Sequence, residues 1–294
     1  MAEIGRRHHK NLLKAGIHPN EEEREQKIQE VLEAVKDKSK LQTPAKNDLD
    51  SPIDEEGVKV ALKESANGAA PGLDGIIYKY WKFLQRVKEE DKKRKEPKYQ
   101  GLDIMKSLTM VYKDIEIYGV DKNSQFTEGW MCPIYKKGER ELIKNYRPIT
   151  LLNSDYKIFT KEKAIQLAKA APNCIHKNQA GFMPGRDIRD QVRLARLMVH
   201  YTEATKQNRL LTALDQEKAY DKITHDYLLC ALETYNFLEL FRKTVKFLYE
   251  NAEASVMING VLSQPFNVTR GVRQGDPLSC LLFNIMIEPL ANLL

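Results

Sequence analysis

The sequence of 294 residues lacks a long apolar run, a paired set of cysteines and a strong charge of one sign. Its most apolar stretch, residues 278–294, is interrupted by Asn284, Glu288 and Pro289, which favours a buried helix over a membrane span. The N-terminus has no apolar signal region. We therefore expect an intracellular protein, nuclear or cytoplasmic, that does not bind a membrane.

Cysteine spacing and net charge narrow the class of protein further. No two cysteines form a C-x-x-C pair or have metal-ligand spacing, which predicts reduced thiols at Cys132, Cys174, Cys230 and Cys280. The 47 Lys and Arg against 41 Asp and Glu give a net charge of +6. This mildly basic balance is compatible with nucleic-acid binding, and it equally fits a soluble protein with surplus surface lysine.

The N-terminal part of the chain alternates helical patterns with polar segments. Residues 19–38 are rich in Glu, Lys and Gln and carry one apolar stripe, which predicts an exposed helix. Residues 39–51 are polar and predict a linker. Ser51 followed by Pro52 is typical of a helix start, so we expect a helix from there to about residue 66.

Two segments follow that predict turns or loops. Residues 67–76 are rich in Gly and Pro, which predicts a tight turn entering an aromatic helix with Tyr78 and Trp81. Residues 88–98 form a run of mixed charge. Because acids interrupt the lysines, the run favours a solvated loop over a nuclear-targeting signal.

Residues 130–149 predict a β-hairpin, because two short strand-like segments flank a turn of Lys and Gly. The hairpin carries Lys136, Lys137 and Arg147. These cations suit an anionic ligand, since the planar guanidinium matches phosphate oxygens and lysine adds a mobile charge. A surface hairpin with ordinary charges explains the same pattern, so this segment alone does not establish an anion-binding site.

The second half of the chain predicts three helices and a second hairpin. Helices are expected over residues 187–207, after Thr224 as N-cap, and over residues 238–250. Asn259 and Gly260 lie between two apolar runs, which is a strong signal for a hairpin turn.

The stretch from Leu210 to Asp221 is the first candidate for a chemical site. An apolar run that stops at Asp215 predicts a buried strand that delivers a carboxylate to a rim. A hard cation such as Mg²⁺ binds carboxylate oxygens together with substrate phosphates. Tyr220, five positions later, is placed to stand over the same site. A strand-capping aspartate in an ordinary α/β protein explains the stretch equally well.

The second candidate is residues 270–284, in which glycines and a proline directly precede an apolar helical run. Gly275 lets the backbone approach a ligand closely. Pro277 fits the first position of a helix, where its missing N–H needs no partner.

Five motifs, taken in order, resemble those of reverse transcriptases. They are P-G-L-D-G at 71–75, Y-R-P-I at 146–149, Q-A-G-F-M-P-G-R at 179–186, L-D-Q-E-K-A-Y-D at 214–221 and R-Q-G-D-P-L-S at 273–279. The third motif resembles one specific to non-LTR and group II relatives, and the set resembles in particular the enzymes of non-LTR retrotransposons of fungal type. A structural α/β domain with accidental motifs is the weakest alternative.

The resemblance implies an α+β, right-hand polymerase fold. We expect a helical and linker extension at residues 1–50, fingers at 51–200 and a partial palm at 201–294, with the palm truncated and the thumb absent. The implied partners are an RNA template, a DNA primer and deoxynucleoside triphosphates, and the implied cofactor is Mg²⁺. The oligomeric state is not predicted.

The resemblance also implies roles for individual residues at the centre of the site. Asp215 is the implied catalytic residue and a metal ligand. It is expected at a strand tip, facing Gln274 and Gly275 across a cleft sized for a nucleotide and its magnesium. Gln274, with Gly275 behind it, is expected beside the nucleotide and the templating base.

The remaining implied residues bind phosphates or the sugar. Arg147, and more weakly Lys136, are expected to hold the triphosphate of the incoming nucleotide. Tyr220 is expected to stack under the sugar and exclude a 2′-hydroxyl. Arg186 and Lys137 are expected to contact the nucleic acid.

A reverse transcriptase also needs a Tyr/Phe-x-Asp-Asp hairpin, and these 294 residues contain no Asp-Asp pair. We therefore expect a fragment that is inactive alone and active in a longer parent, with exposed apolar surface where the 278–294 helix lacks partner strands. The alternative is a non-catalytic RNA-binding remnant that uses Lys136, Arg147 and Arg186. Salt-dependent RNA binding without any effect of nucleotide would favour this alternative.

Overall fold

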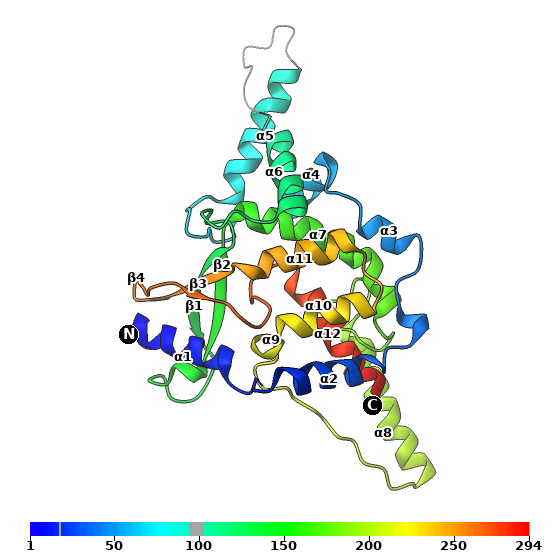
Figure 1. Ribbon diagram of the computed structural model, residues 1–294. Coiled ribbons are helices and arrows are strands. Elements are labelled where there is room, and N and C mark those ends of the chain that lie inside the picture. The colour runs from blue at the N-terminus through cyan, green and yellow to red at the C-terminus, as the bar shows by residue number, and fades with distance from the viewer. Residues whose placement is uncertain (18, 94–102, 294) are drawn as a thin grey trace.

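The fold combines one sheet with a surrounding body of helices, as seen in a computed structural model that describes residues 1–17, 19–93 and 103–293 (Figure 1). The described strands are β1 (Glu128–Tyr135), β2 (Tyr146–Leu152), β3 (Glu253–Ile258), β4 (Val261–Leu262) and β5 (Phe266–Asn267). β1 pairs with β2 antiparallel and with β3 in parallel, so the sheet joins segments more than a hundred residues apart. β3 also pairs antiparallel with β4 and β5.

Both predicted hairpins are confirmed. In the first, Ile134 lies opposite Arg147, and the short 3₁₀ helix η2 (Ile143–Asn145) closes the turn. In the second, β3 and β4 flank Asn259 and Gly260, whose positive φ angles of 52° and 78° suit a two-residue turn.

The helical body is built around α7 (Ser154–Cys174), whose aromatic side chains are buried together with those of its neighbours. Tyr156 and Phe159 of α7 pack against Phe126, and Phe159 also packs against Tyr112 of α6 (Ile104–Tyr118). A buried ion pair joins Lys163 of α7 to Glu116 of α6. Among the described helices, α3 (Ala45–Leu49), α4 (Glu55–Glu64) and α12 (Ser279–Leu293) also contact α7.

The N-terminal region contains α1 (Ala2–Lys14), α2 (Glu21–Leu32), η1 (Asp37–Ser39) and α3 (Ala45–Leu49). The predicted exposed helix is confirmed as α2, and two residues of its apolar stripe, Ile28 and Leu32, lie in the core. The predicted linker is wrong. Leu41 and Leu49 are buried, and the Leu41 N–H donates to the Tyr235 carbonyl at 2.9 Å.

The start of α4 differs from the prediction by three residues. Asp54, and not Ser51, is the N-cap, and its carboxylate accepts a hydrogen bond from the Gly57 N–H at 2.7 Å. Ile53 is fully buried, and its N–H donates to the Glu116 carboxylate at 3.0 Å. This long-range bond holds the chain extended up to Asp54.

Helices α5 (Tyr78–Lys92) and α6 project from the body as a pair (Figure 1). The aromatic helix that was predicted after the 67–76 turn is therefore confirmed as α5. The predicted charged loop is wrong where it is described, because residues 88–92 belong to α5, and residues 94–98 lie outside the described residues.

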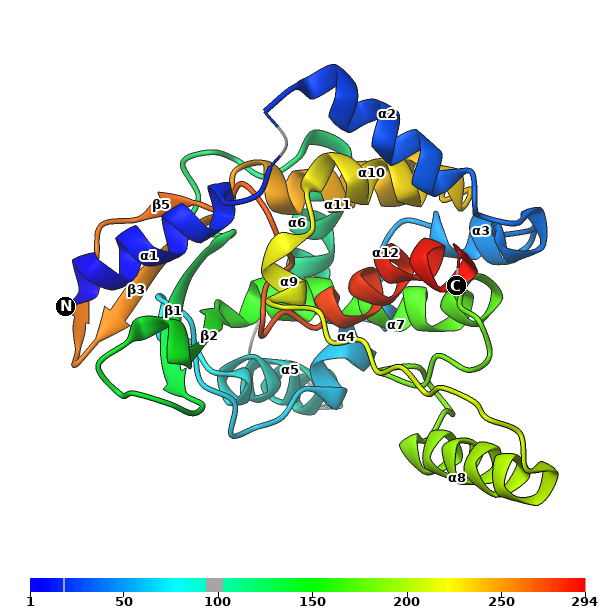
Figure 2. The same ribbon diagram turned by 90° about the horizontal axis from the view of Figure 1, so that it is seen from below.

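Helix α8 (Ile188–Thr205) confirms the predicted helix, and it projects away from the body (Figure 2). Its N-cap is Asp187, whose carboxylate accepts a hydrogen bond from the Arg189 N–H. None of its residues is buried. The remaining described helices are α9 (Ala219–Lys222), α10 (His225–Thr234) and α11 (Glu239–Glu250). In the described part of the chain, no helix is long and apolar enough to cross a membrane.

Candidate active site

The segment that carries Asp215 is extended but is not a strand. Residues 207–216 pair with no described strand, and Leu210, Leu211 and Leu214 are 91%, 74% and 72% exposed. The predicted buried strand is therefore wrong in this structure. A strand forms only where a neighbouring strand satisfies its backbone N–H and C=O groups, and no described strand pairs with this segment. Asp215 is accordingly an exposed side chain.

The next few residues turn back onto α12. Lys218 has a positive φ of 51° and begins the short helix α9. The Tyr220 ring then packs on the Phe283 ring of α12, with centroids 4.7 Å apart. Burial, together with a hydrogen bond to Cys280, raises the pKa of the Tyr220 hydroxyl above its usual range. Tyr220 is thus a fixed aromatic surface at the end of the candidate site.

The loop before α12 is tied directly to this turn. The Gly271 N–H donates to the Ile223 carbonyl at 2.6 Å, and the Val272 N–H donates to the Tyr220 carbonyl at 2.9 Å. Gly271 has a φ of 85°, and a Cβ there would lie 2.7 Å from the Tyr220 oxygen. Only glycine fits this position without displacing the turn.

The same loop is also tied to the first hairpin. The Thr150 N–H of β2 donates to the Gln274 carbonyl at 2.7 Å, and a Cβ at Gly275 would overlap the Thr150 carbonyl oxygen. Thr150 lies three residues after Arg147 on β2. The structure therefore brings together the Tyr220 turn, the Gln274–Gly275 loop and the strand that carries Arg147.

A buried polar cluster supports the loop from behind. Arg273 is 4% exposed, and its guanidinium carbon lies 5.4 Å from the centroid of the Tyr156 ring. The Tyr156 hydroxyl donates to the Asp276 carboxylate at 3.2 Å, and the Asp276 carboxylate also accepts a hydrogen bond from the Leu278 N–H at 3.1 Å. Burial raises the pKa of the Asp276 carboxyl. Helix α12 begins at Ser279, so the helix starts two residues later than the prediction that Pro277 is its first residue.

These support residues were missed by sequence reasoning. Arg273 and Asp276 lie inside the quoted motif, but no sequence pattern distinguishes a buried arginine from an exposed one. Arg270 was missed for the same reason. Its guanidinium donates to the Lys222 carbonyl and to the Ala15 carbonyl, both at 2.7 Å, and so joins three distant segments.

The predicted cations of the hairpin are exposed. Arg147 lies on β2, and Lys136 and Lys137 lie where β1 enters the turn. The Lys136 N–H donates to the Asn145 carbonyl at 3.0 Å, which fixes the backbone and leaves the side chain toward solvent. A contact of these three side chains with phosphates stays a prediction.

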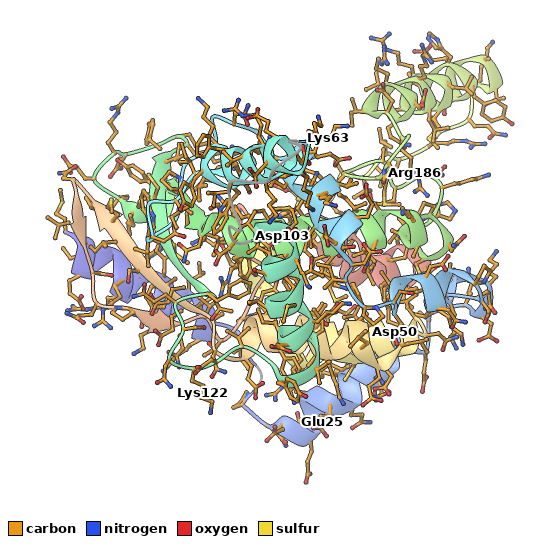
Figure 3. All side chains as sticks on the ribbon, turned by 90° about the horizontal axis from the view of Figure 1, so that it is seen from above. Glu25, Asp50, Lys63, Asp103, Lys122 and Arg186 are labelled. Carbon is orange, nitrogen blue, oxygen red and sulfur yellow. The ribbon has the colours of Figure 1, made fainter. Side chains whose placement is uncertain are left out.

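Arg186 has a different environment from the one expected. It lies where α8 joins the body (Figure 3). Its guanidinium donates to the carbonyls of His176, Gln179 and Ile175 at 2.6, 2.7 and 3.1 Å. Arg186 therefore holds the 175–179 loop in place. A contact with nucleic acid stays a prediction.

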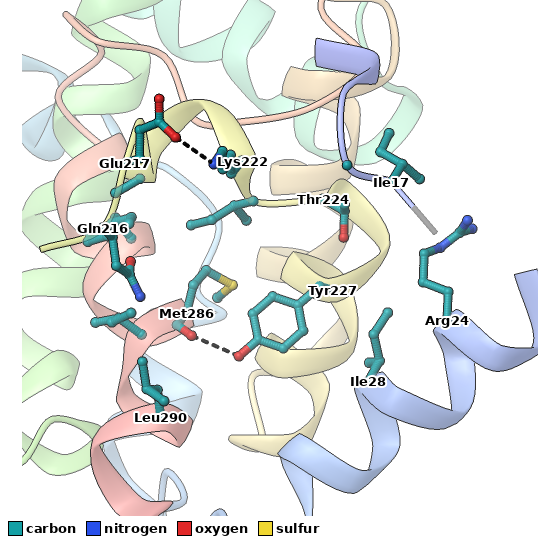
Figure 4. Close-up of a pocket in the computed structure, with 15 residues that line it drawn as sticks. Ile17, Arg24, Ile28, Gln216, Glu217, Lys222, Thr224, Tyr227, Met286 and Leu290 are labelled. Atoms are coloured by element: carbon teal, nitrogen blue, oxygen red, sulfur yellow. Dashed lines mark hydrogen bonds and ion pairs between the residues drawn. The ribbon is translucent and has the colours of Figure 1, made fainter. Parts of the chain in front are cut away.

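A cavity of about 580 Å³ opens beside the Asp215 segment (Figure 4). Its apolar wall includes Ile28, Met286 and Leu290. Two ion pairs lie around it, Glu217 with Lys222 at 3.5 Å and Arg24 with Asp226 at 2.8 Å. Gln216 and Glu217 line this cavity, so the segment after Asp215 lies against the helical body.

The site is incomplete as a metal centre in the part of the chain that the structure describes. There, no group of three or more His, Cys, Asp or Glu side chains is placed to hold a metal ion. Asp215, Glu217 and Asp221 are the acids of this stretch, and burial raises the pKa of the Asp221 carboxyl. Asp215 and Glu217 are exposed, and Glu217 pairs with Lys222 at 3.5 Å.

The fold and these motifs define a class. The chain belongs to the reverse transcriptase (RNA-dependent DNA polymerase) family, whose model matches residues 134–294. It is 35% identical over 249 residues to the transposon TX1 uncharacterized 149 kDa protein of Xenopus laevis, which covers 85% of this chain and 18% of that protein.

Two further relatives are polyproteins of R2 elements. The chain is 31% identical over 116 residues to the retrovirus-related Pol polyprotein from the type-2 retrotransposable element R2DM of Drosophila melanogaster, covering 40% of this chain and 11% of the relative. It is 24% identical over 143 residues to the corresponding polyprotein of Nasonia vitripennis, covering 49% and 14%. The chain is thus a reverse transcriptase domain of the non-LTR retrotransposon type, and it spans less than a fifth of the length of these relatives.

Proposed function

We propose that this chain forms the fingers and the first half of the palm of an RNA-directed DNA polymerase, which in a longer parent adds deoxynucleotides to a primer. In this proposal residues 51–200 are fingers, residues 201–294 are partial palm and residues 1–50 are a helical extension. The observation that carries it is the convergence of the Tyr220 turn, the Gln274–Gly275 loop and β2. That the element is of fungal type stays a sequence-based expectation, which the animal relatives do not test.

The proposed nucleotide site assigns one task to each segment. Arg147, with Lys136 nearby, holds the triphosphate, because a guanidinium fork forms charge-assisted hydrogen bonds to phosphate oxygens. Tyr220 lies under the sugar, where its ring is fixed by Phe283. The Gln274–Gly275 backbone lies beside the base pair, where its bond to Thr150 prevents it from moving.

Members of this family use divalent metal ions, and we propose Mg²⁺ with Asp215 as one ligand. The ion would stabilise the charge that develops on the reacting phosphate. The described residues do not complete its coordination. We therefore expect primer extension by this chain no faster than that of its Asp215→Ala variant.

Template-directed binding of a nucleotide tests the proposal directly. The chain is mixed with an RNA template annealed to a DNA primer, and the affinity for each of the four deoxynucleoside triphosphates is measured by equilibrium fluorescence. The complementary nucleotide should bind most tightly, and Arg147→Ala should weaken it about tenfold or more, since a charge-assisted hydrogen bond contributes about 1.5–3 kcal/mol. Arg196→Ala on α8 is the control, because Arg196 is exposed on a different element.

The same titration separates the alternative, an RNA-binding remnant. The exposed hairpin cations and the incomplete metal set favour that alternative. It predicts RNA binding that falls with salt and does not respond to any nucleotide. Equal affinity for complementary and mismatched nucleotides would therefore contradict the polymerase proposal.

A further inference from the structure

Helix α1 presents two faces of different chemistry. Its buried face, Ala2, Gly5, His9 and Leu13, packs on the sheet. The approach is close, since a Cβ at Gly5 would lie 2.9 Å from Val256 of β3. Burial lowers the pKa of His9 to about 4, so this ring stays neutral against the sheet.

The opposite face carries a stripe of cations, Arg7, Lys10 and Lys14. Their spacing of three and four residues places them on one side of the helix, and all three are exposed. None of them forms an ion pair among the described residues, because Glu3, the one acid of α1, pairs with Arg6. Cations without partners at helical spacing are available for an external anion.

This cation stripe is held next to the candidate active site. Helix α1 contacts η2 of the hairpin at one side and α9 at the other (Figures 1 and 2). At its C-terminal end, the Ala15 carbonyl accepts a hydrogen bond from Arg270, which also holds Lys222 of the motif turn. The helix therefore spans from the hairpin to the Tyr220 turn as a fixed element.

Each neighbour of α1 also carries a cation. Lys144 of η2 is exposed. Burial, together with the charge of Lys218 before α9, lowers the pKa of His8, which places Lys218 near His8 and not on the stripe. From Arg7 to Lys14 the helix rises about 10 Å, at 1.5 Å per residue. That length matches about three nucleotides of a stacked strand, at roughly 3.4 Å each.

We propose that Arg7, Lys10 and Lys14 form a binding surface for the phosphate backbone of an RNA strand that passes between the hairpin and the Tyr220 turn. The proposal rests on the proposed function in one respect, which is that RNA is the nucleic acid the chain binds. The surface reads no bases, since lysine and arginine on a helix face reach phosphates without contacting base edges. Its contribution is affinity and placement of the strand.

Fluorescence anisotropy with a labelled single-stranded RNA tests this surface without nucleotide or metal. The variant Arg7→Gln/Lys10→Gln/Lys14→Gln should weaken binding on the order of tenfold to fiftyfold at 0.15 M salt. The slope of log affinity against log salt should fall by about 2, because each phosphate contact on a single strand contributes about 0.7. A charge-keeping variant, Arg7→Lys/Lys10→Arg/Lys14→Arg, should bind as the parent does.

The matched control removes three exposed lysines from other helices, Lys106→Gln/Lys113→Gln/Lys246→Gln, and so changes the net charge equally. It should retain both affinity and salt slope. Equal losses in the two glutamine variants would show that only net charge matters and would overturn the proposal. So would unchanged binding in the stripe variant, or a loss seen only with a DNA strand of the same sequence.

Failure here is distinguishable from failure of the proposed function. The stripe variant can keep its full RNA affinity while complementary nucleotides still bind more tightly than mismatched ones, which would overturn only the stripe proposal. Conversely, all four nucleotides can bind equally while the stripe variant binds RNA more weakly, which would overturn only the proposed function.

Discussion

Replacing Gly271 with alanine should separate the two halves of the candidate site. A left-handed backbone costs a residue with a Cβ about 1–2 kcal/mol. The new methyl group would also lie 2.7 Å from the Tyr220 carbonyl oxygen, a backbone atom that cannot rotate away. Overpacking of this kind adds about 1–3 kcal/mol. We therefore expect Gly271→Ala to lower the free energy of unfolding by about 2–5 kcal/mol.

The matched control is Gly260→Ala. Gly260 has a similar φ of 78°, but a Cβ there meets nothing within 4 Å. It should lose only the backbone contribution of about 1–2 kcal/mol. Urea unfolding of both variants gives the difference, which isolates the contact between Gly271 and the Tyr220 turn. Equal midpoints for the two variants would refute the reasoning.

Three other outcomes follow from the structure. Burial raises the pKa of Glu162 to about 7, so the folded state retains a proton that the unfolded state releases above about pH 4.5. The free energy of unfolding should therefore fall as pH rises between these values. Glu162→Gln should be more stable than the parent at pH 8, by up to about 3 kcal/mol, but not at pH 4.5. The same pH dependence of stability in parent and variant would count against this. Leu211→Ser/Leu214→Ser should reduce binding of a hydrophobic dye without lowering the melting temperature, since both leucines are exposed, and a lower melting temperature would show that they are packed. Arg186→Lys should speed proteolysis of the 175–186 loop, because lysine cannot reproduce three carbonyl contacts from one planar group, whereas equal cleavage rates would exclude a loop-holding role.

Elements set by local pattern were predictable from the sequence. The β1–β2 hairpin follows from two strand-like segments around a turn, and α8 follows from the helical period of its apolar residues. Both motifs were recognised in the sequence, but the sequence did not predict which backbone atoms of Tyr220 and residues 271–272 contact each other. The sequence predicted a close backbone approach at Gly275 but not the contact with Thr150, and it gave no signal for the contact of Gly271 with Tyr220.

The wrong predictions share a physical cause: contacts with residues distant in the sequence determine the local structure at these positions. Ser51 and Asp54 both fit the pattern of an N-cap, and the bond from Ile53 to Glu116 selects Asp54. The segment at 210–214 has the composition of a strand, yet it pairs with no described strand and stays extended in solvent. The predicted roles of Asp215, Tyr220 and the other site residues stay predictions.

Photo-crosslinking tests the central claim most directly, namely that the hairpin strand and the Gln274–Gly275 loop form one nucleotide site. A photoreactive deoxynucleoside triphosphate, complementary to the template, is crosslinked in the presence of RNA template and DNA primer, and the labelled peptides are mapped. The account predicts label within residues 146–152 and 270–276, both lost on competition with the unmodified nucleotide and both reduced by Arg147→Ala. Label on only one of these segments, or label that Arg147→Ala leaves unchanged, would contradict it.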